Sequence, residues 1–460
     1  MKPQRCAQLL FLLLLAPILQ AADKSPDVCA TCIQKNLEYL AGPELHGRGS
    51  GTEDEHHAAQ YIADQLKSYG LKPAAENGEY IQTGSITTRK VTGSPTLTYT
   101  RGSATVTLTQ GKELALFAVT QPEVSSPLQK LDLTGPQTSL DSIKPGAVVL
   151  LKLKPDSKLE NIVAPLVGSK AAMVIIPVSA DKEPRFERLL KSGPRPEKKL
   201  ADEPSGPNAM LMTQDAADQM WTLADSAPIK FHADVTPWET THTWNVLAKI
   251  EGTTNSLQII LLSAHLDHLG VHDGKTYPGA DDDASGTVAV MEMARALAKE
   301  KPPQRTIVVS LFGSEEAGLI GSRYFLQHPT FPLNDIVANL NFEMIGRADP
   351  KVKPNELWLT GWERTNLGPE LAAHGAQLVG DPHPDQGFFQ RSDNFALAKK
   401  GIVAQSVSSY GLHTDYHQPT DTVDKIDWTH LDSAIGSMIA PVSWLANSSF
   451  TPAWNAGGKP

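Results

Sequence analysis

The chain has 460 residues, 40% hydrophobic and 20% charged, so it can bury a substantial core divided over about two or three domains. Its formal net charge of −10 disfavours a nucleic-acid partner, because phosphate binding requires a basic surface. The acidic side chains form no long run of one sign and are expected to solubilise the surface.

Residues 1–22 are predicted to be a secretory signal peptide. Lys2 and Arg5 form a basic start, an apolar stretch covers residues 9–19, and small residues follow. The apolar stretch is shorter than the ~20 residues of a membrane-spanning helix, although an uncleaved anchor is the alternative. We therefore expect an exported protein, secreted or periplasmic, with no membrane span after cleavage.

Two cysteines, Cys29 and Cys32, follow the predicted signal with the spacing C-x-x-C. A zinc ribbon would need a second pair, which the sequence lacks, and a thioredoxin-like motif would need a preceding strand. In an exported protein this pair is expected to form a local disulfide. Such a short loop should add little stability, because few chain conformations are removed by closing it.

The rest of the chain divides by character into a discontinuous α/β domain and an insert. Residues 23–104 and 242–447 are assigned to the α/β domain, and residues 105–241 to the insert. The insert has short β-branched runs separated by loops, and it has no cluster of His, Asp and Glu at ligand-like spacing. Residues 448–460 contain Pro, Gly and small polar residues and are expected to form a flexible tail.

The α/β domain starts with helical segments broken by a glycine-rich link at residues 47–51. Its second part alternates strands with helices, which implies a mainly parallel, twisted sheet covered by helices on both faces. Strands are predicted at 245–250, 257–263, 305–312 and 336–344, and helices at 286–300 and 316–327.

Metal-competent side chains follow the first of the buried strands. His265 stands at the end of strand 257–263, and ligands bind beyond the carboxyl ends of strands in open α/β sheets. A single such histidine is more often structural. Asp267 strengthens the metal reading, because a carboxylate can accept the other ring N–H of a metal-bound histidine.

Three aspartates, residues 281–283, then open a helix between glycines. One aspartate would suffice as a helix cap, so three in a row indicate that one carboxylate has another task. Glu315 and Glu316 stand together after the next strand. Two neighbouring carboxylates can divide their work, one held by a cation and one free to take a proton.

Glu343 lies in an apolar strand, and His417 lies in a turn-rich segment. A buried, unpaired carboxylate is costly, so Glu343 is either an ion-pair partner or a cation ligand. His417 alone would be interpreted as a surface residue. Together with the three motifs before them, these residues supply two histidines and three carboxylates, the donors that zinc takes. This set predicts two zinc ions per chain, which share one aspartate.

These motifs, in this order, resemble those of the M28 family of zinc peptidases. The resemblance covers roughly residues 30–90 and 243–447. It implies that the metal ligands are His265, Asp282, Glu316, Glu343 and His417, with Asp282 as the bridge. It also implies that Glu315 is the general base, that Asp267 orients a ligand histidine, and that Tyr416 stabilises an oxyanion.

Two positions depart from the family pattern. Glu343 stands where many aminopeptidases of the family have aspartate, and Asn394 stands where a histidine is frequent. The longer Glu343 side chain is expected to reshape the substrate end of the site. The insert resembles the protease-associated domain that several members carry, by its position and β-rich character.

The resemblance implies an exopeptidase that acts on peptide or protein substrates, and release of N-terminal residues is the favoured reaction. The two ions are expected to activate a water and polarise the scissile carbonyl, while Glu315 moves the proton. A carboxypeptidase or dipeptidase is the alternative, and Glu343 keeps it open. Glutaminyl cyclisation and a non-catalytic, receptor-like binding protein are disfavoured, because ligands and base are all present.

Overall fold

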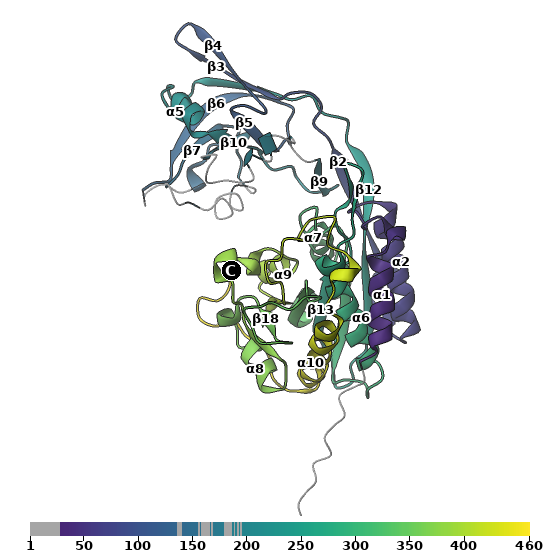
Figure 1. Cartoon of the computed structure of the whole chain (residues 1–460). Helices are drawn as coiled ribbons and strands as arrows, with labels where there is room; N and C mark the ends of the chain where they lie inside the picture. Colours follow the sequence, from purple (N-terminus) through teal and green to yellow (C-terminus); the bar gives the residue numbers. More distant parts are fainter. Residues whose placement is uncertain are drawn as a thin grey trace, which may run out of the picture.

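The structure is a computed structural model that describes residues 28–135, 140–154, 169–178 and 196–460, with positions 157, 166, 186, 187, 189, 190 and 193. The predicted signal peptide, residues 1–22, lies outside the described residues. Figure 1 shows a larger body that carries most of the helices and a smaller, β-rich body joined to it by β2 and β12. Within the described ranges, no helix is both long and apolar enough to cross a membrane.

A ten-stranded sheet forms the larger body, in the order β19-β18-β20-β17-β13-β16-β12-β2-β9, with β1 paired to β12. Its strands are β1 (Lys72–Pro73), β2 (Ile81–Arg89), β9 (Glu197–Leu200), β12 (Glu239–Ile250), β13 (Asn255–His265), β16 (Arg305–Phe312), β17 (Ile336–Glu343), β18 (Leu357–Leu359), β19 (Leu378–Gly380) and β20 (Ala404–Ser408). The central strands β16, β13, β17 and β20 pair in parallel, whereas β12, β2 and β9 are added antiparallel. The predicted α/β fold is confirmed, but the sheet is mixed rather than mainly parallel, because antiparallel strands are added on both sides of the parallel centre.

Helices cover both faces of this sheet because successive side chains of a strand point to opposite faces. In β13, Ile260 and Leu262 pack in a core with α1, α2, α6 and α10, whereas Ile259 and Leu261 pack on the face covered by α7 and α9. The helices of this body are α1 (Ala30–Leu40), α2 (Glu53–Ser68), α6 (Gly286–Leu297), α7 (Ile320–Gln327), α8 (Leu367–Ala373), α9 (Asn394–Lys399) and α10 (Trp428–Asn447). Burial on both faces explains why the central strands read as unbroken apolar runs.

The smaller body contains an eight-stranded sheet with cores of its own. Its elements are β3 (Thr96–Arg101), β4 (Ala104–Thr109), β5 (Leu114–Ala118), β6 (Glu123–Asp132), β7 (Val148–Lys152), β8 (Met173–Val178), β10 (Asn208–Thr213), α5 (Gln214–Trp221) and β11 (Pro228–His232). The boundary predicted at residue 105 would cut the β3–β4 hairpin, in which Thr100 pairs with Thr105. The eight-stranded sheet therefore starts upstream of that boundary.

Both ends of the described chain are anchored on the larger body. Cys29 and Cys32 form the expected disulfide, and the Cys29 amide donates to Glu292 Oε1 at 2.6 Å. The tail from residue 448, predicted to be flexible, is instead held in place. The Trp454 indole N–H donates to the Gly401 carbonyl at 3.0 Å, and the Asn455 amide donates to the Arg364 carbonyl at 2.8 Å. Phe450 also packs on the larger body, where its ring stacks on Trp444, so two aromatic side chains anchor a tail whose composition is otherwise small and polar.

Candidate metal centre

Three neighbouring parallel strands end at one edge of the sheet. The strand β13 ends at His265, β17 ends at Glu343, and β16 leads into the loop that carries Glu315 and Glu316. Parallel strands deliver their carboxyl ends to the same edge, so side chains far apart in sequence meet there. Asp282 joins them from the turn Ala280–Ser285, which leads into α6.

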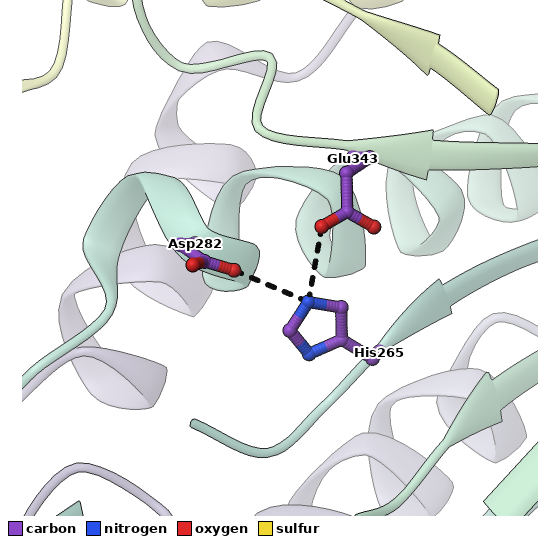
Figure 2. Close-up of side chains that lie close together, drawn as sticks. All are labelled: His265, Asp282 and Glu343. Carbon is purple, nitrogen blue, oxygen red and sulfur yellow. Dashed lines mark hydrogen bonds and ion pairs between the residues drawn. The ribbon is translucent and has the colours of Figure 1, made fainter. Parts of the chain in front are cut away.

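A first ligand group consists of His265, Asp282 and Glu343 (Figure 2). His265 Nε2 lies 3.2 Å from Asp282 Oδ1 and 3.3 Å from Glu343 Oε1. The donor atoms of the three residues all lie within 4.8 Å of one another, and His265 is only 1% exposed. One imidazole nitrogen and two carboxylates converging in a buried place form a donor set suited to zinc.

A second group lies on the other side of Asp282. His417 Nε2 lies 3.0 Å from Glu316 Oε1 and 3.2 Å from Asp282 Oδ2. Asp282 therefore directs one carboxylate oxygen to each group. The sequence-predicted ligands are thus all brought together, in two sets that share Asp282.

His268 is a candidate ligand that the sequence reasoning missed. Its Nδ1 lies 3.0 Å from Glu316 Oε1 and 3.9 Å from Asp282 Oδ2, and the side chain is fully buried. His268, Asp282 and Glu316 form a second group with metal-ligand spacing. The sequence does carry a signal, because His268 follows His265 by three residues beyond the same strand.

Buried polar atoms in this second group lack ordinary hydrogen bonds. Both ring nitrogens of His268, together with Asp282 Oδ2 and Glu316 Oε1, are buried. Apart from the close ion-pair contacts among themselves and with His417, they have no hydrogen-bond partner among the described residues. Buried polar atoms are almost always satisfied in folded proteins, so such a cluster indicates a missing partner. A cation held by these atoms would partner the carboxylates and one imidazole nitrogen at once, and the donor set therefore fits zinc.

The three consecutive aspartates have different partners, which explains the run. Asp281 Oδ1 accepts from the Gly346 amide at 2.7 Å, and its Oδ2 lies 2.8 Å from His413 Nε2. Asp283 Oδ1 accepts from the Met344 amide at 2.9 Å, and thereby joins the turn to the end of β17. Asp282 alone directs its carboxylate toward both ligand groups.

Burial and ion pairing determine the protonation of Asp282 and Glu316. Burial acts to raise the pKa of Asp282, but its close contacts with the His265 and His417 rings hold it well below its usual range. Burial likewise opposes ionisation of Glu316, yet contacts with His268 and His417 lower its pKa to about 2. Both carboxylates are therefore ionised at neutral pH, as metal ligands must be.

Glu315 has a different environment from that of Glu316. Burial raises the pKa of Glu315 well above its usual range, and the negative charges of Glu343 and Glu316 add to this effect although His265 opposes it. Its backbone amide donates to Asp267 Oδ1 at 2.9 Å. A carboxylate whose pKa is shifted toward neutrality and whose backbone is anchored is suited to accept and return a proton.

Asp267 acts on the loop of Glu315 more directly than on His265. The predicted hydrogen bond to His265 Nδ1 is made by the main-chain carbonyl of Asp267 at 3.1 Å, whereas its carboxylate lies 3.6 Å away. The carboxylate instead accepts from the Ser50 hydroxyl at 2.6 Å and from the Glu315 amide. The sequence placed Asp267 beside the histidine but could not show that its own backbone satisfies the ring.

Tyr416 lies beside a pocket that opens next to Glu343. The Tyr416 ring stacks on His417 with centroids 3.9 Å apart, and the Arg391 guanidinium donates to its hydroxyl at 3.3 Å. The pocket walls are mainly aromatic and hydroxyl side chains: Glu343, Met344, Trp358, Thr360, Phe388, Arg391, Ser392, Ser406, Ser408, Tyr410 and Tyr416. These residues come from separate segments, so no local sequence pattern could have revealed the pocket.

Parts of the chain are similar to known peptidases. Residues 245–442 match the sequence model of a family described as peptidase family M28. A probable zinc metalloprotease of Pyrenophora tritici-repentis is 39% identical over 108 residues, which cover 23% of this chain and 22% of the relative. The leucine aminopeptidase 2 of Arthroderma otae is 27% identical over 221 residues, which cover 42% of this chain and 43% of the relative. The matches therefore span less than half the length of these curated relatives.

The fold is shared with solved structures over nearly the whole chain. An aminopeptidase from Aneurinibacillus sp. strain AM-1 superposes with a TM-score of 0.58 at 20% identity, covering 92% of this chain and 95% of that one. At this identity the likeness describes the fold alone.

Proposed function

Residues 245–442 match the model of peptidase family M28, and from this likeness we propose that the chain is an exported dinuclear zinc aminopeptidase. The observation that carries the proposal is the position of Asp282, whose two oxygens face two separate groups of buried donors. His265 and Glu343 would hold one ion, and Glu316 with His417 or His268 would hold the other. Export rests on the composition of residues 1–22, and a protease-associated insert rests on its β-rich character.

When bound, the ions would lower the pKa of an attacking water and polarise the scissile carbonyl. Glu315 accepts the proton of the water and returns it to the leaving amine, because its raised pKa makes both transfers feasible. The Tyr416 hydroxyl, held by Arg391, donates to the oxygen that becomes negative. Asp267 keeps the Glu315 backbone in place during these transfers.

The pocket beside Glu343 suits the side chain of the residue that is released. Trp358, Phe388 and Tyr410 give it apolar walls, which favour a bulky apolar or aromatic side chain. Glu343 is 20% exposed at the pocket, so its carboxylate can also face a free α-amino group. Both features agree with the removal of N-terminal residues.

A carboxypeptidase is the second candidate, because Arg391 lines the same pocket. A guanidinium is the side chain best suited to bind a terminal carboxylate. The test is a panel of aminoacyl-p-nitroanilides and of N-acylated peptides with a free carboxylate, each assayed with and without a chelator. The proposal expects chelator-sensitive release from the anilides alone. Cleavage confined to the N-acylated peptides would replace it by the carboxypeptidase.

A further inference from the structure

A short segment of the insert is built into the larger body. The strand β9 lies between β8 and β10 of the eight-stranded sheet in the sequence, yet it pairs antiparallel with β2 of the ten-stranded sheet. Leu200 is fully buried against Ile86 and Ile320. Just beyond it, Glu203 accepts from Arg323 Nε at 3.1 Å on α7. This segment therefore contacts α7, the helix that follows the Glu315 loop.

Lys198 of β9 contacts the glycine-rich link directly. Its Nζ donates to the Ser50 carbonyl at 2.5 Å, and its side chain is half-buried. Burial lowers the pKa of Lys198, while the charges of Glu55 and Asp267 act in the opposite direction. A lysine from the insert thus brings a positive charge close to two buried carboxylates of the larger body.

Each of these two carboxylates accepts hydrogen bonds both from the glycine-rich link and from the loop that carries Glu315. Asp267 joins the Ser50 hydroxyl, at 2.6 Å, to the Glu315 amide, at 2.9 Å. Glu55 accepts from the Gly51 amide and, at 3.1 Å, from the hydroxyl of Ser314. Ser314 has a φ of 50°, a left-handed conformation that a non-glycine residue holds only when its surroundings enforce it.

We propose that Lys198 is a positioning residue through which the insert holds the Glu315 loop in its productive place. The path runs from Lys198 to Ser50 and from Ser50 through Asp267 to the Glu315 backbone. This inference rests on the proposed function, since it assigns Lys198 an effect on proton transfer by Glu315. The insert is then part of the catalytic apparatus, although it supplies none of the proposed ligands.

The neighbouring lysine provides a matched control. Lys199 lies on the opposite side of β9 and donates to the Glu203 carbonyl, away from the link. Lys198→Met removes the charge and the donor, Lys198→Arg keeps both, and Lys199→Met removes the same groups on the other side. Wild-type activity on aminoacyl-p-nitroanilides, measured first, tests the proposed function by itself.

With that activity in hand, Lys198→Met should lower kcat by about 10- to 100-fold, because displacing a reacting group by about 1 Å has an effect of this order. KM, zinc content and the thermal midpoint should stay near wild type, Lys198→Arg should restore most of kcat, and Lys199→Met should match wild type. Equal kcat in Lys198→Met and Lys199→Met, or a fall in kcat accompanied by loss of zinc, would overturn the inference.

A double-mutant cycle with Ser50→Ala supplies a second measurement. Ser50→Ala removes the hydroxyl that reaches Asp267 but leaves the carbonyl that Lys198 contacts. If the two residues act along one path, the double variant should lose little more kcat than the worse single variant. Fully additive losses would show that Lys198 acts independently of Glu315 positioning.

Discussion

Replacing Glu315 by glutamine separates proton transfer from every other property of the site. Glutamine has nearly the same shape as glutamate, and the backbone amide that donates to Asp267 is unchanged. The carboxylate of Glu315 lies among Glu316 and Glu343, whose charges raise its pKa, so its neutralisation should relieve repulsion. Fold, stability and zinc content are therefore expected to persist in Glu315→Gln.

The loss of the base should appear in turnover alone. A positioned general base contributes about 10²- to 10⁴-fold to a rate, which corresponds to about 3–5 kcal/mol of transition-state stabilisation. We expect kcat of Glu315→Gln on an aminoacyl-p-nitroanilide to fall within that range, with KM changed by less than about threefold. The control is Glu79→Gln, which changes an exposed glutamate far from Glu315 in the sequence.

The pH dependence of kcat/KM provides a second test of Glu315. Glu315 must be ionised to accept a proton, and its raised pKa moves the acidic limb of kcat/KM above the ordinary value of 4.5 for a glutamate. That limb should vanish in Glu315→Gln. Turnover within about threefold of wild type, or an unchanged acidic limb, would refute the assignment of Glu315 as the base.

Three further predictions concern the ligands and the buried carboxylate behind the Glu315 loop. Asp282→Asn should weaken the zinc affinity of both metal sites by more than about 100-fold, because the charge of Asp282 serves both ligand groups. A titration with a zinc indicator measures both affinities, and loss of a single site would contradict the bridging role of Asp282. His268→Ala and His417→Ala distinguish the two histidines that face Glu316: the true ligand is the one whose removal leaves one zinc per chain, and retention of two zincs by both variants would exclude both. Burial raises the pKa of Glu55 to about 8, with Asp267 adding to the effect, so its folded state binds a proton more tightly than its unfolded state. Its contribution to the free energy of unfolding is therefore present below about pH 4.5 and is lost as pH rises to about 8. Denaturation at pH 5 and pH 8 should show a smaller difference in Glu55→Gln than in the wild type, and an equal difference would show that another group is responsible.

Much of the larger body could be predicted because its strands are buried on both faces. The strand β16, Arg305–Phe312, has the predicted bounds, since an apolar run between loops has little freedom to pair otherwise. Short antiparallel additions such as β9 could not be predicted, because four residues rich in lysine and glutamate carry no strand signal.

The ligand residues could be predicted because strand ends concentrate them at one edge. The division of work among the three aspartates could not, since it depends on amides of residues about 60 positions away, such as those of Met344 and Gly346. His268 was overlooked for a related reason. A histidine shows whether it is a ligand only by the direction of its ring nitrogens, which sequence spacing leaves open.

Zinc stoichiometry tests most directly whether two ions share Asp282. Purified, active protein should be analysed by inductively coupled plasma mass spectrometry, with activity followed as zinc is removed and returned. Two zincs per chain are expected, with activity lost on removal and restored on return. Full activity with one zinc per chain, or with none, would contradict it.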